Sequence, residues 1–434
     1  MRTSRHPVAA AVAAALLPLL LAAPAQATNG YFSHGYGIKA IGMAGAGIAL
    51  PQDAIAAANN PAGMAMIGNR VDFGLNWFSP SGREATIVGS PAPFNNTSYD
   101  GDGKTSFFVP EFGYNQAYTK EMTLGVSVYG NGGMNTEYNK PFPLFCSAPP
   151  NPSCSNPGVD LSQLFIAPTL AYRVTPQHAL GVSLNLAFQR FKATGLQNFT
   201  APSGPNQFSA YPGNVTDQGY DNSYGAGLRI GYLGQLTPSF AVGLTYQTKT
   251  WMTEFDKYKG LFAEAGDFDI PASYGIGLSF KPMDALTLAL DVVRIDYSSI
   301  KSINNPLLPN LFQAPLGTDG GAGFGWQDVT AYKLGIQYDV NPQLTIRGGY
   351  NYGEQPIPAS ETLFNVLAPG VVEDHWTLGA TWTLANKSEL SFAFMYAPSV
   401  TVTGVNSIPS VFGGGNVNLK LKEMSFGVAY GWRF

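Results

Sequence analysis

The dominant pattern in this chain is an alternation of apolar residues with small or polar ones at every second position. Over residues 424–434, the even positions carry Met, Phe, Val, Tyr, Trp and Phe, and the odd positions carry Ser, Gly, Ala, Gly and Arg. Successive side chains of a β-strand point to opposite faces, so this period predicts strands with one apolar and one small or polar face. The same alternation runs through residues 180–188, 239–247, 273–280, 332–338 and 376–384.

The connections between these strands fall into two length classes that alternate along the chain. Bacterial outer-membrane barrels have short periplasmic turns and long outer loops. The pattern therefore predicts an all-β fold, a 14-stranded antiparallel transmembrane β-barrel with both ends on the short-turn side. The short connections are 119–121, 175–177, 237–239, 281–284, 341–343 and 385–387, and the long ones lie near 80–104, 139–159, 195–221, 257–267, 300–325, 356–373 and 404–416.

Composition favours the same architecture. Charged residues make up 12% of the chain, about half the share usual in soluble globular proteins. No segment after residue 27 is apolar enough to cross a bilayer as a helix. A closed barrel satisfies its backbone between strands and shows lipid only every second side chain. A soluble β-sandwich would alternate as well, but it has no reason to sort its loops by length.

Residues 1–27 have the features of a secretory signal peptide. Arg2 and Arg5 precede an apolar run over 8–23, and Ala25-Gln26-Ala27 supplies a small-x-small cleavage pattern. A membrane-spanning helix would need roughly 20 uninterrupted apolar residues. Loss of the two arginines moves the formal charge from −4 to −6, and nothing in that balance suggests nucleic acid as a partner.

Residues 28–69 do not alternate, and they precede a predicted barrel over 70–434. They are rich in Gly and Ala, and Asp53 is placed to cap a short helix that ends before Pro61. A 14-stranded barrel has a lumen too wide for its own side chains to fill, so about forty small residues ahead of it suggest a plug, or hatch. A periplasmic tail is the alternative, but such tails are usually polar and charged.

The motif Asn60-Pro61-Ala62, its Gly-rich surroundings and the 14 predicted strands resemble the FadL family of outer-membrane long-chain fatty acid transporters, which includes TodX-like aromatic hydrocarbon channels. The resemblance covers essentially the whole mature chain. It implies a hatch inside the barrel and a third strand kinked inward. Ligand then leaves sideways through a gap in the wall that faces the Asn-Pro-Ala segment.

Two further stretches gain meaning from this resemblance. The predicted third strand contains Gly130, Asn131, Gly132 and Gly133, and glycines inside a strand favour a bulge, here the family's kink. Residues 188–192 resemble a family stretch whose arginine approaches the ligand carboxylate, which would make Phe188 and Arg190 ligand-binding candidates. Simple alternation places both on the outward face, so this role requires a local bulge.

The chain lacks the motifs of an enzyme. Of its mature histidines, only His375 is expected near the outer rim, and neither Ser360 nor Ser391 carries a supporting nucleophile motif. There is no phosphate-binding loop, dinucleotide fingerprint or Cys/His metal cluster in the sequence. We therefore expect no catalytic residues, no cofactor and no metal.

Four charged residues fall on the inward parity of their strands. Inward charges are unfavourable unless they are paired or hydrated, so we expect them to hold the hatch rather than to bind a substrate carboxylate. Lys39, Asp53 and Asn59 are the available hatch partners. The four residues are Arg173, Arg229, Asp291 and Arg347.

Two functions remain. The first is a passive channel for hydrophobic small molecules in the outer membrane of a Gram-negative bacterium, with a pocket lined partly by Tyr31, Phe32 and Tyr36. The second is an adhesin or structural barrel that binds a partner through its loops. Apolar residues in loops that should be wet favour the channel, since a docking groove explains them. Lipid, lipopolysaccharide and the barrel assembly machinery, which reads a terminal aromatic such as Phe434, complete the expected partners. The apolar loop residues are Leu144, Phe145, Phe208, Leu307, Leu308, Leu311, Phe312, Val366 and Leu367.

Cys146 and Cys154 are the only cysteines, eight positions apart in a proline-rich loop of an exported chain, and we predict that they form a disulfide. Loss of the bond should cost roughly 2–3 kcal/mol of local loop order with little effect on the barrel. Mass spectrometry of unreduced peptides checks this, and two free thiols would show the prediction to be wrong.

Overall fold

The structure is a computed structural model, and it describes residues 29–91, 95–146, 154–203 and 207–434. The predicted signal peptide, residues 1–27, lies outside the described residues. None of the helices in the described part of the chain has the length and apolar character of a membrane-spanning helix.

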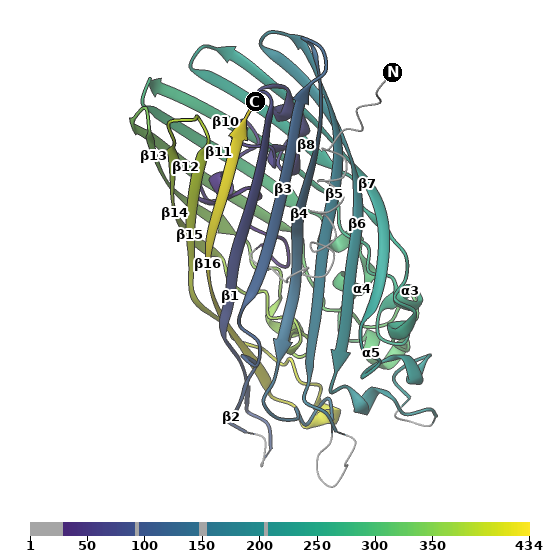
Figure 1. Ribbon diagram of the computed structural model, residues 1–434. Coiled ribbons are helices and arrows are strands. Elements are labelled where there is room, and N and C mark those ends of the chain that lie inside the picture. Colours follow the sequence, from purple (N-terminus) through teal and green to yellow (C-terminus); the bar gives the residue numbers. More distant parts are fainter. Residues whose placement is uncertain (1–28, 92–94, 147–153, 204–206) are drawn as a thin grey trace.

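The described residues form a closed antiparallel barrel of fourteen long strands, as the alternation predicted (Figure 1). Each strand pairs with its sequence neighbour, and β16 closes the barrel on β1 over a register that runs from Arg70↔Arg433 to Val88↔Asn416. The long strands are β1 (Arg70–Val88), β3 (Phe107–Ala117), β4 (Met122–Glu137), β5 (Gly158–Thr175), β6 (His178–Thr194), β7 (Asp221–Thr237), β8 (Phe240–Gln247), β10 (Ser273–Met283), β11 (Leu286–Ile295), β12 (Val329–Asn341), β13 (Leu344–Gly353), β14 (Asp374–Thr383), β15 (Glu389–Val402) and β16 (Asn416–Arg433).

The two remaining strands and most of the short helices belong to the long loops. β2 (Thr97–Asp100) pairs with the outer end of β1, and β9 (Trp251–Met252) pairs with β7. The helices gather with the long loops at the barrel end opposite the C-terminus (Figure 1). They are η3 (Gln197–Phe199), η4 (Pro212–Asn214), η5 (Asp256–Tyr258), α3 (Ala263–Gly266), η6 (Tyr297–Ser299), α4 (Lys301–Asn304), α5 (Asn310–Gln313), η7 (Ala359–Glu361), η8 (Phe364–Val366) and η9 (Ser410–Phe412).

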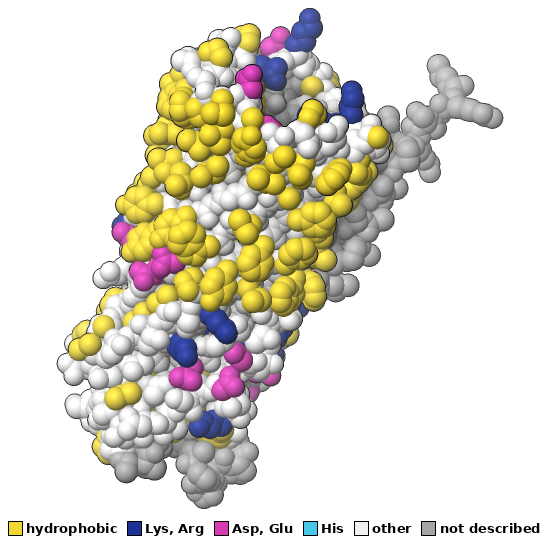
Figure 2. Space-filling model, turned by 90° about the vertical axis from the view of Figure 1, so that its left-hand side faces the viewer, with side chains coloured by type: hydrophobic (Ala, Val, Ile, Leu, Met, Phe, Trp, Pro, Cys, Tyr) yellow, Lys and Arg dark blue, Asp and Glu magenta, His cyan; other side chains and the backbone are white. Residues whose placement is uncertain are grey.

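The outward positions of the strands carry the apolar side chains. On β16, Phe426, Tyr430 and Trp432 are exposed while Ser425 and the intervening glycines face inward. Figure 2 shows the result as a broad band of hydrophobic side chains, with most charged side chains of that face beyond it. Phe434 lies exposed against the ring of Tyr114 at 5.9 Å, and its recognition by assembly machinery stays a prediction.

The N-terminal segment fills the lumen, where its backbone packs directly on wall glycines. It contains α2 (Ile38–Ile41), η1 (Ala56–Ala58) and η2 (Pro61–Ala65), and it appears in purple inside the barrel in Figure 1. A methyl group added at Gly113 would lie 2.5 Å from the Ala54 backbone, and one at Gly349 would lie 2.6 Å from that of Met43. Glycine at these wall positions therefore lets the hatch approach the wall at backbone distance.

The disulfide between Cys146 and Cys154 is present in the long loop after β4, with the two Cα atoms 5.7 Å apart. Phe142 and Phe145, just before Cys146, pack on each other with ring centroids 4.9 Å apart.

Candidate functional site

Carboxylates on the inner wall bind the hatch backbone. Glu111 of β3 accepts hydrogen bonds from the amides of Gly37 and Ile38 at 3.2 and 3.0 Å. Asp291 of β11 accepts from the amides of Gly47 and Ile48 at 2.8 and 3.0 Å. Because these N–H groups have no helix or sheet to satisfy them, the wall carboxylates replace secondary structure for the hatch.

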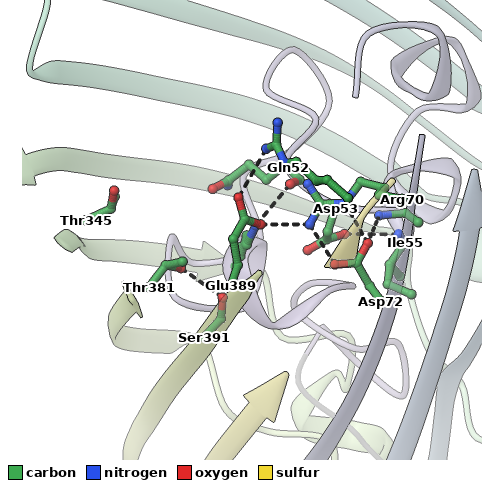
Figure 3. Close-up of polar contacts among 12 residues, drawn as sticks. Gln52, Asp53, Ile55, Arg70, Asp72, Thr345, Thr381, Glu389 and Ser391 are labelled. Atoms are coloured by element: carbon green, nitrogen blue, oxygen red, sulfur yellow. Dashed lines mark hydrogen bonds and ion pairs between the residues drawn. The ribbon is translucent and has the colours of Figure 1, made fainter. Parts of the chain in front are cut away.

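A second anchor is an ion cluster around Glu389, shown in Figure 3. Its carboxylate accepts from Lys39 of the hatch at 2.5 Å, from Arg70 of β1 at 2.9 Å and from Arg433 of β16 at 3.1 Å. Arg70 also pairs with Asp72 at 2.7 Å, and Asp72 in turn accepts from the amide of Ala54 at 2.9 Å. The cluster joins the hatch to the seam where the barrel closes.

The inward charges predicted from strand parity hold the hatch, as expected. Arg173 donates to the Ala65 carbonyl, Arg229 to the Ala58 carbonyl, and Arg347 to the Gln52 side chain at 2.9 Å. The partner assignments differ from the expectation, because Lys39 pairs with Glu389. Sequence analysis missed Glu111, Glu389, Arg70 and Asp72 as anchors, although the same inward parity in their strands could have found them.

The motif Asn60-Pro61-Ala62 lies against β6 and β7, and not at the third strand of the barrel. The Asn60 amide donates to the carbonyls of Ile48 and Tyr232 at 2.8 and 2.9 Å, and its oxygen accepts from Ala62 at 3.1 Å. Methyl groups added at Gly181 or Gly231 would collide with this motif. The motif is therefore a fixed anchor of the hatch, and the expectation that it covers a gap beside the third strand is wrong in this structure.

The hydrogen-bond ladder of the wall is interrupted between β3 and β4, the second and third strands of the barrel, and we call this interruption the gap. Their pairing runs only from Ala117↔Thr123 to Phe112↔Val128, although both strands continue beyond it. A register shift between Gly130 and Gly132 marks a bulge, and residues 127–134 of β4 are buried on both faces. The predicted bulge at these glycines is thus present, and β4 keeps its pairing to β5 on both sides of it. The fourth strand of the barrel, β5, therefore keeps its partner, whereas residues 107–111 of β3 have no partner on β4.

The tip of the hatch occupies the edge of β4 that β3 leaves free. The amide of Ser33 donates to the Asn131 carbonyl at 3.0 Å, and the amide of Gly133 donates to the Tyr31 carbonyl at 2.9 Å, so that Phe32 and Gly132 form a bridge. A side chain at Gly132 would collide with the Tyr31 carbonyl. Residues 31–33, which we call the hatch tip, therefore replace β3 as the neighbour of β4.

An aromatic layer clamps the hatch tip from the side of the loops. The Tyr297 hydroxyl donates to the Asn29 carbonyl at 2.6 Å and accepts from the amide of Tyr31 at 3.1 Å. The Tyr31 ring lies 5.2 Å from Tyr297, 6.0 Å from Trp326 and 6.1 Å from Phe268. Tyr36 contributes below the tip, where its hydroxyl donates to the Asn131 side chain at 3.1 Å.

An apolar cavity of about 30 Å³ lies above this layer, under the long loops. Five of the nine apolar loop residues singled out in the sequence are buried, and two of them, Phe145 and Leu367, line this cavity and form part of its roof. Phe208, Phe312 and Phe412 make a further ring cluster above the roof, and Phe312 is 50% exposed. Because this cluster is partly exposed, it forms an apolar spot on the outer face. The buried loop residues do not contribute to that face.

Phe188 and Arg190 do not reach the lumen. The ladders of β6 to β5 and β7 run through these positions without a shift, so both side chains keep the outward parity. Arg190 lies over the ring of Tyr220 at 4.2 Å, and Phe188 packs on Tyr224 at 5.4 Å. The bulge that a ligand-binding role for Arg190 requires is absent from this part of the described chain.

Lys333 of β12 is a buried cation that does not hold the hatch. It lines a small polar cavity beside Tyr36, Arg229 and Asp291. Within the described residues it makes no ion pair. Close by in the wall, His375, the second residue of β14, is buried and stacks on His34 of the hatch with ring centroids 5.8 Å apart. Among the residues with described positions, no three His, Cys, Asp or Glu side chains gather as a metal site.

A closed barrel with an apolar outer band and its own N-terminal segment in the lumen is a plugged transmembrane β-barrel. The family model for outer membrane protein transport proteins (OMPP1/FadL/TodX) matches residues 19–434, and the chain belongs to this family. It therefore resides in the outer membrane of a Gram-negative bacterium. Its family consists of transport channels for hydrophobic compounds and not of enzymes.

Solved structures agree on the fold. The toluene transporter TodX of P. putida superimposes with a TM-score of 0.67 at 17% identity, covering 92% of this chain and 99% of that one. A FadL homologue of Pseudomonas aeruginosa gives 0.65 at 16%, covering 93% and 100%. The toluene transporter TbuX of Ralstonia pickettii gives 0.61 at 18%, covering 92% and 99%. Comparison with curated proteins gives no match.

The Glu389 cluster predicts how the hatch can be loosened. Glu389→Leu leaves the Lys39 and Arg70 cations buried without their shared partner, a change that costs about 3–5 kcal/mol. We expect the hatch to detach from the barrel seam and the channel to conduct ions in planar bilayers, with the hatch open to protease. Asp319→Leu, which removes an exposed loop carboxylate, is the control. Conductance equal to that of the wild type would contradict the anchoring role.

Proposed function

We propose that this chain takes up hydrophobic small molecules, namely long-chain fatty acids or aromatic or aliphatic hydrocarbons, through a hatch-gated pocket and a lateral opening between β3 and β4. The observation that carries the proposal is the exchange of strand partners, because the hatch tip occupies the β4 edge that β3 leaves free. A wall sealed by a movable segment can open sideways without breaking the barrel.

The route begins at the ring cluster of Phe208, Phe312 and Phe412, where an apolar molecule can land on the outer surface. It continues into the apolar cavity under the roof. That cavity has a volume of about 30 Å³, roughly the volume of one water molecule in the liquid, so the structure represents a closed state of the channel. A ligand that enlarges this cavity must push on the aromatic layer, and the layer contacts the hatch tip directly through Tyr31.

Displacement of the hatch tip then exposes the β4 edge at the gap. A free strand edge is tolerated in a membrane protein only where protein or a water-filled cavity covers it. An apolar ligand that leaves through the gap enters the bilayer directly, below the polysaccharide layer. The similarity to toluene transporters and to a FadL homologue supports a hydrophobic cargo of this kind.

A cross-link across the gap tests the lateral route. The side chain of Val109 on β3 lies 2.8 Å from where a Cβ atom of Gly130 on β4 would be, so Val109→Cys with Gly130→Cys should form a disulfide between these strands. We expect the oxidised variant to lose uptake of oleate and toluene in proteoliposomes, and a reductant to restore it. Normal heat-modifiable gel mobility shows that the barrel is intact.

The controls are each single variant and the wild type with the same reductant, which also opens the native disulfide. Full uptake in the oxidised double variant would leave only passage along the lumen. A wild type that takes up neither probe would favour the alternative, a surface adhesin or structural barrel that binds a partner through its loops.

A substitution of Lys333 distinguishes a fatty acid from a hydrocarbon as the substrate. A carboxylate that reaches the cavity beside Tyr36 meets an unpaired ammonium there, whereas a hydrocarbon gains nothing from it. If the cargo is a fatty acid, Lys333→Met should weaken oleate uptake by about tenfold and leave toluene uptake unchanged. Equal effects on both probes would mean that Lys333 has only a structural role.

A further inference from the structure

One arginine spans the wall where β1 has no strand partner on the side of the gap. The pairing of β1 with β3 ends at Phe78↔Phe107, and its pairing with β2 begins at Glu84↔Asp100. Between them, a bulge after Ser81 with Gly82 at φ +63° shifts the strand by one residue. The bulge turns Arg83 into the barrel, where its side chain is 2% exposed.

The guanidinium of Arg83 joins its own strand, β1, to the loop after β2 and to β4. Its Nε donates to Asp102 at 3.1 Å, and one Nη donates to the carbonyl of Lys104. The other Nη donates to the carbonyl and the side-chain oxygen of Asn135 at 2.6 and 3.0 Å. Asn135 belongs to the part of β4 that does not pair with β3. Arg83 therefore satisfies a β4 carbonyl that a neighbouring strand would otherwise satisfy.

Glu423 of β16 lies beside this arginine without a partner. It is 1% exposed, and neither carboxyl oxygen has a hydrogen-bond partner among the described residues. Its backbone is in register with Pro80 of β1, so Glu423 and Arg83 occupy nearby inward positions on adjacent strands. Both line one cavity of about 30 Å³, together with Gly133, Met134 and Asn135 of β4.

A buried carboxyl group that makes no hydrogen bond destabilises the state in which it is found. The guanidinium next to it is engaged with β4 and with the loop after β2. The unpartnered Glu423 and the engaged guanidinium are explained together if the wall has two states. Arg83 then contacts β4 in one state and Glu423 in the other.

We propose that Arg83 is the latch of the lateral opening and that Glu423 is its partner in the open state. In the closed state, Arg83 holds the Asn135 carbonyl and thereby the part of β4 beyond the bulge. When the hatch tip leaves Gly132, the guanidinium turns across the cavity to Glu423 and releases Asn135, and the gap between β3 and β4 widens. This inference rests on the proposed lateral route and adds the residues that set its equilibrium.

The latch predicts opposite effects from two neighbouring substitutions. Arg83→Met removes the closed-state contacts, so uptake of oleate and toluene should rise. Glu423→Gln keeps the side-chain volume but removes the open-state ion pair, so uptake should fall by about tenfold, as expected for one charge-assisted hydrogen bond. The double variant should behave like Arg83→Met, because Glu423 has no role without the latch.

Hydrogen exchange of residues 129–136 in lipid nanodiscs gives a readout that does not depend on transport. Exchange should be faster than wild type in Arg83→Met and no faster in Glu423→Gln. Arg83→Lys keeps a charge for folding but cannot bridge three segments, and its exchange should be intermediate. Arg294→Met, which removes the ion pair to Asp328 at 3.1 Å on another part of the wall, is the matched control.

The outcomes separate the two proposals. A wild type that takes up neither probe contradicts the proposed function, whereas the exchange data still decide whether Arg83 restrains β4. Uptake or exchange that changes in the same direction in Arg83→Met and Glu423→Gln would overturn the latch, since it would mean that both residues only stabilise the closed wall.

Discussion

Every backbone N–H and C=O group at membrane depth must find a partner within the protein, and the rest of this structure depends on that requirement. The barrel meets it by closing β16 on β1. The ladder between β3 and β4 is interrupted, and other groups of the protein supply the missing hydrogen-bond partners. The hatch tip pairs with β4 near Gly132, and the Arg83 guanidinium binds the Asn135 carbonyl farther along the same strand. Hydrogen-bond partners such as the hatch tip and Arg83 can be exchanged without breaking the barrel. The strands of a continuous ladder cannot separate in this way.

The hatch is held at its periplasmic part by hydrogen bonds and ion pairs together with the packing of its small apolar residues against the wall. Its own residues are mostly small, and it approaches the wall closely at glycines such as Gly113. Carboxylates and guanidinium groups of the wall bind its backbone, as Asp291 and Arg229 do. The hatch tip differs, because rings surround it and only a few backbone bonds fix it. In the proposed route, the anchored part stays in place while the tip moves.

The outer loops pack against the hatch tip. They bury most of their apolar residues in one cluster that reaches the Tyr31 ring. Phe312 and its neighbours keep an apolar spot exposed above the roof. In the proposed route, this apolar cluster links the exposed spot on the surface to the hatch tip.

The sequence by itself determined the barrel, its fourteen strands, the inward position of Arg229 and Asp291, and a hatch ahead of Arg70. The strands and the inward positions depend on period-two alternation and loop length, and the hatch on a Gly- and Ala-rich segment that does not alternate, which are local properties of the chain. Gly130, Gly132 and Gly133 favoured the bulge of β4, and the family resemblance gave it the meaning of a kink. Tertiary structure alone decided that β3 and not the fourth strand loses its partner, that residues 31–33 cover the gap, and that Asn60 anchors at β6 and β7. The last two are contacts between segments far apart in the sequence, and the point at which β3 leaves β4 is set by hydrogen-bond geometry that no local pattern encodes. Arg190 shows the same limit, because resemblance placed it near a ligand while an unbroken ladder keeps it outside.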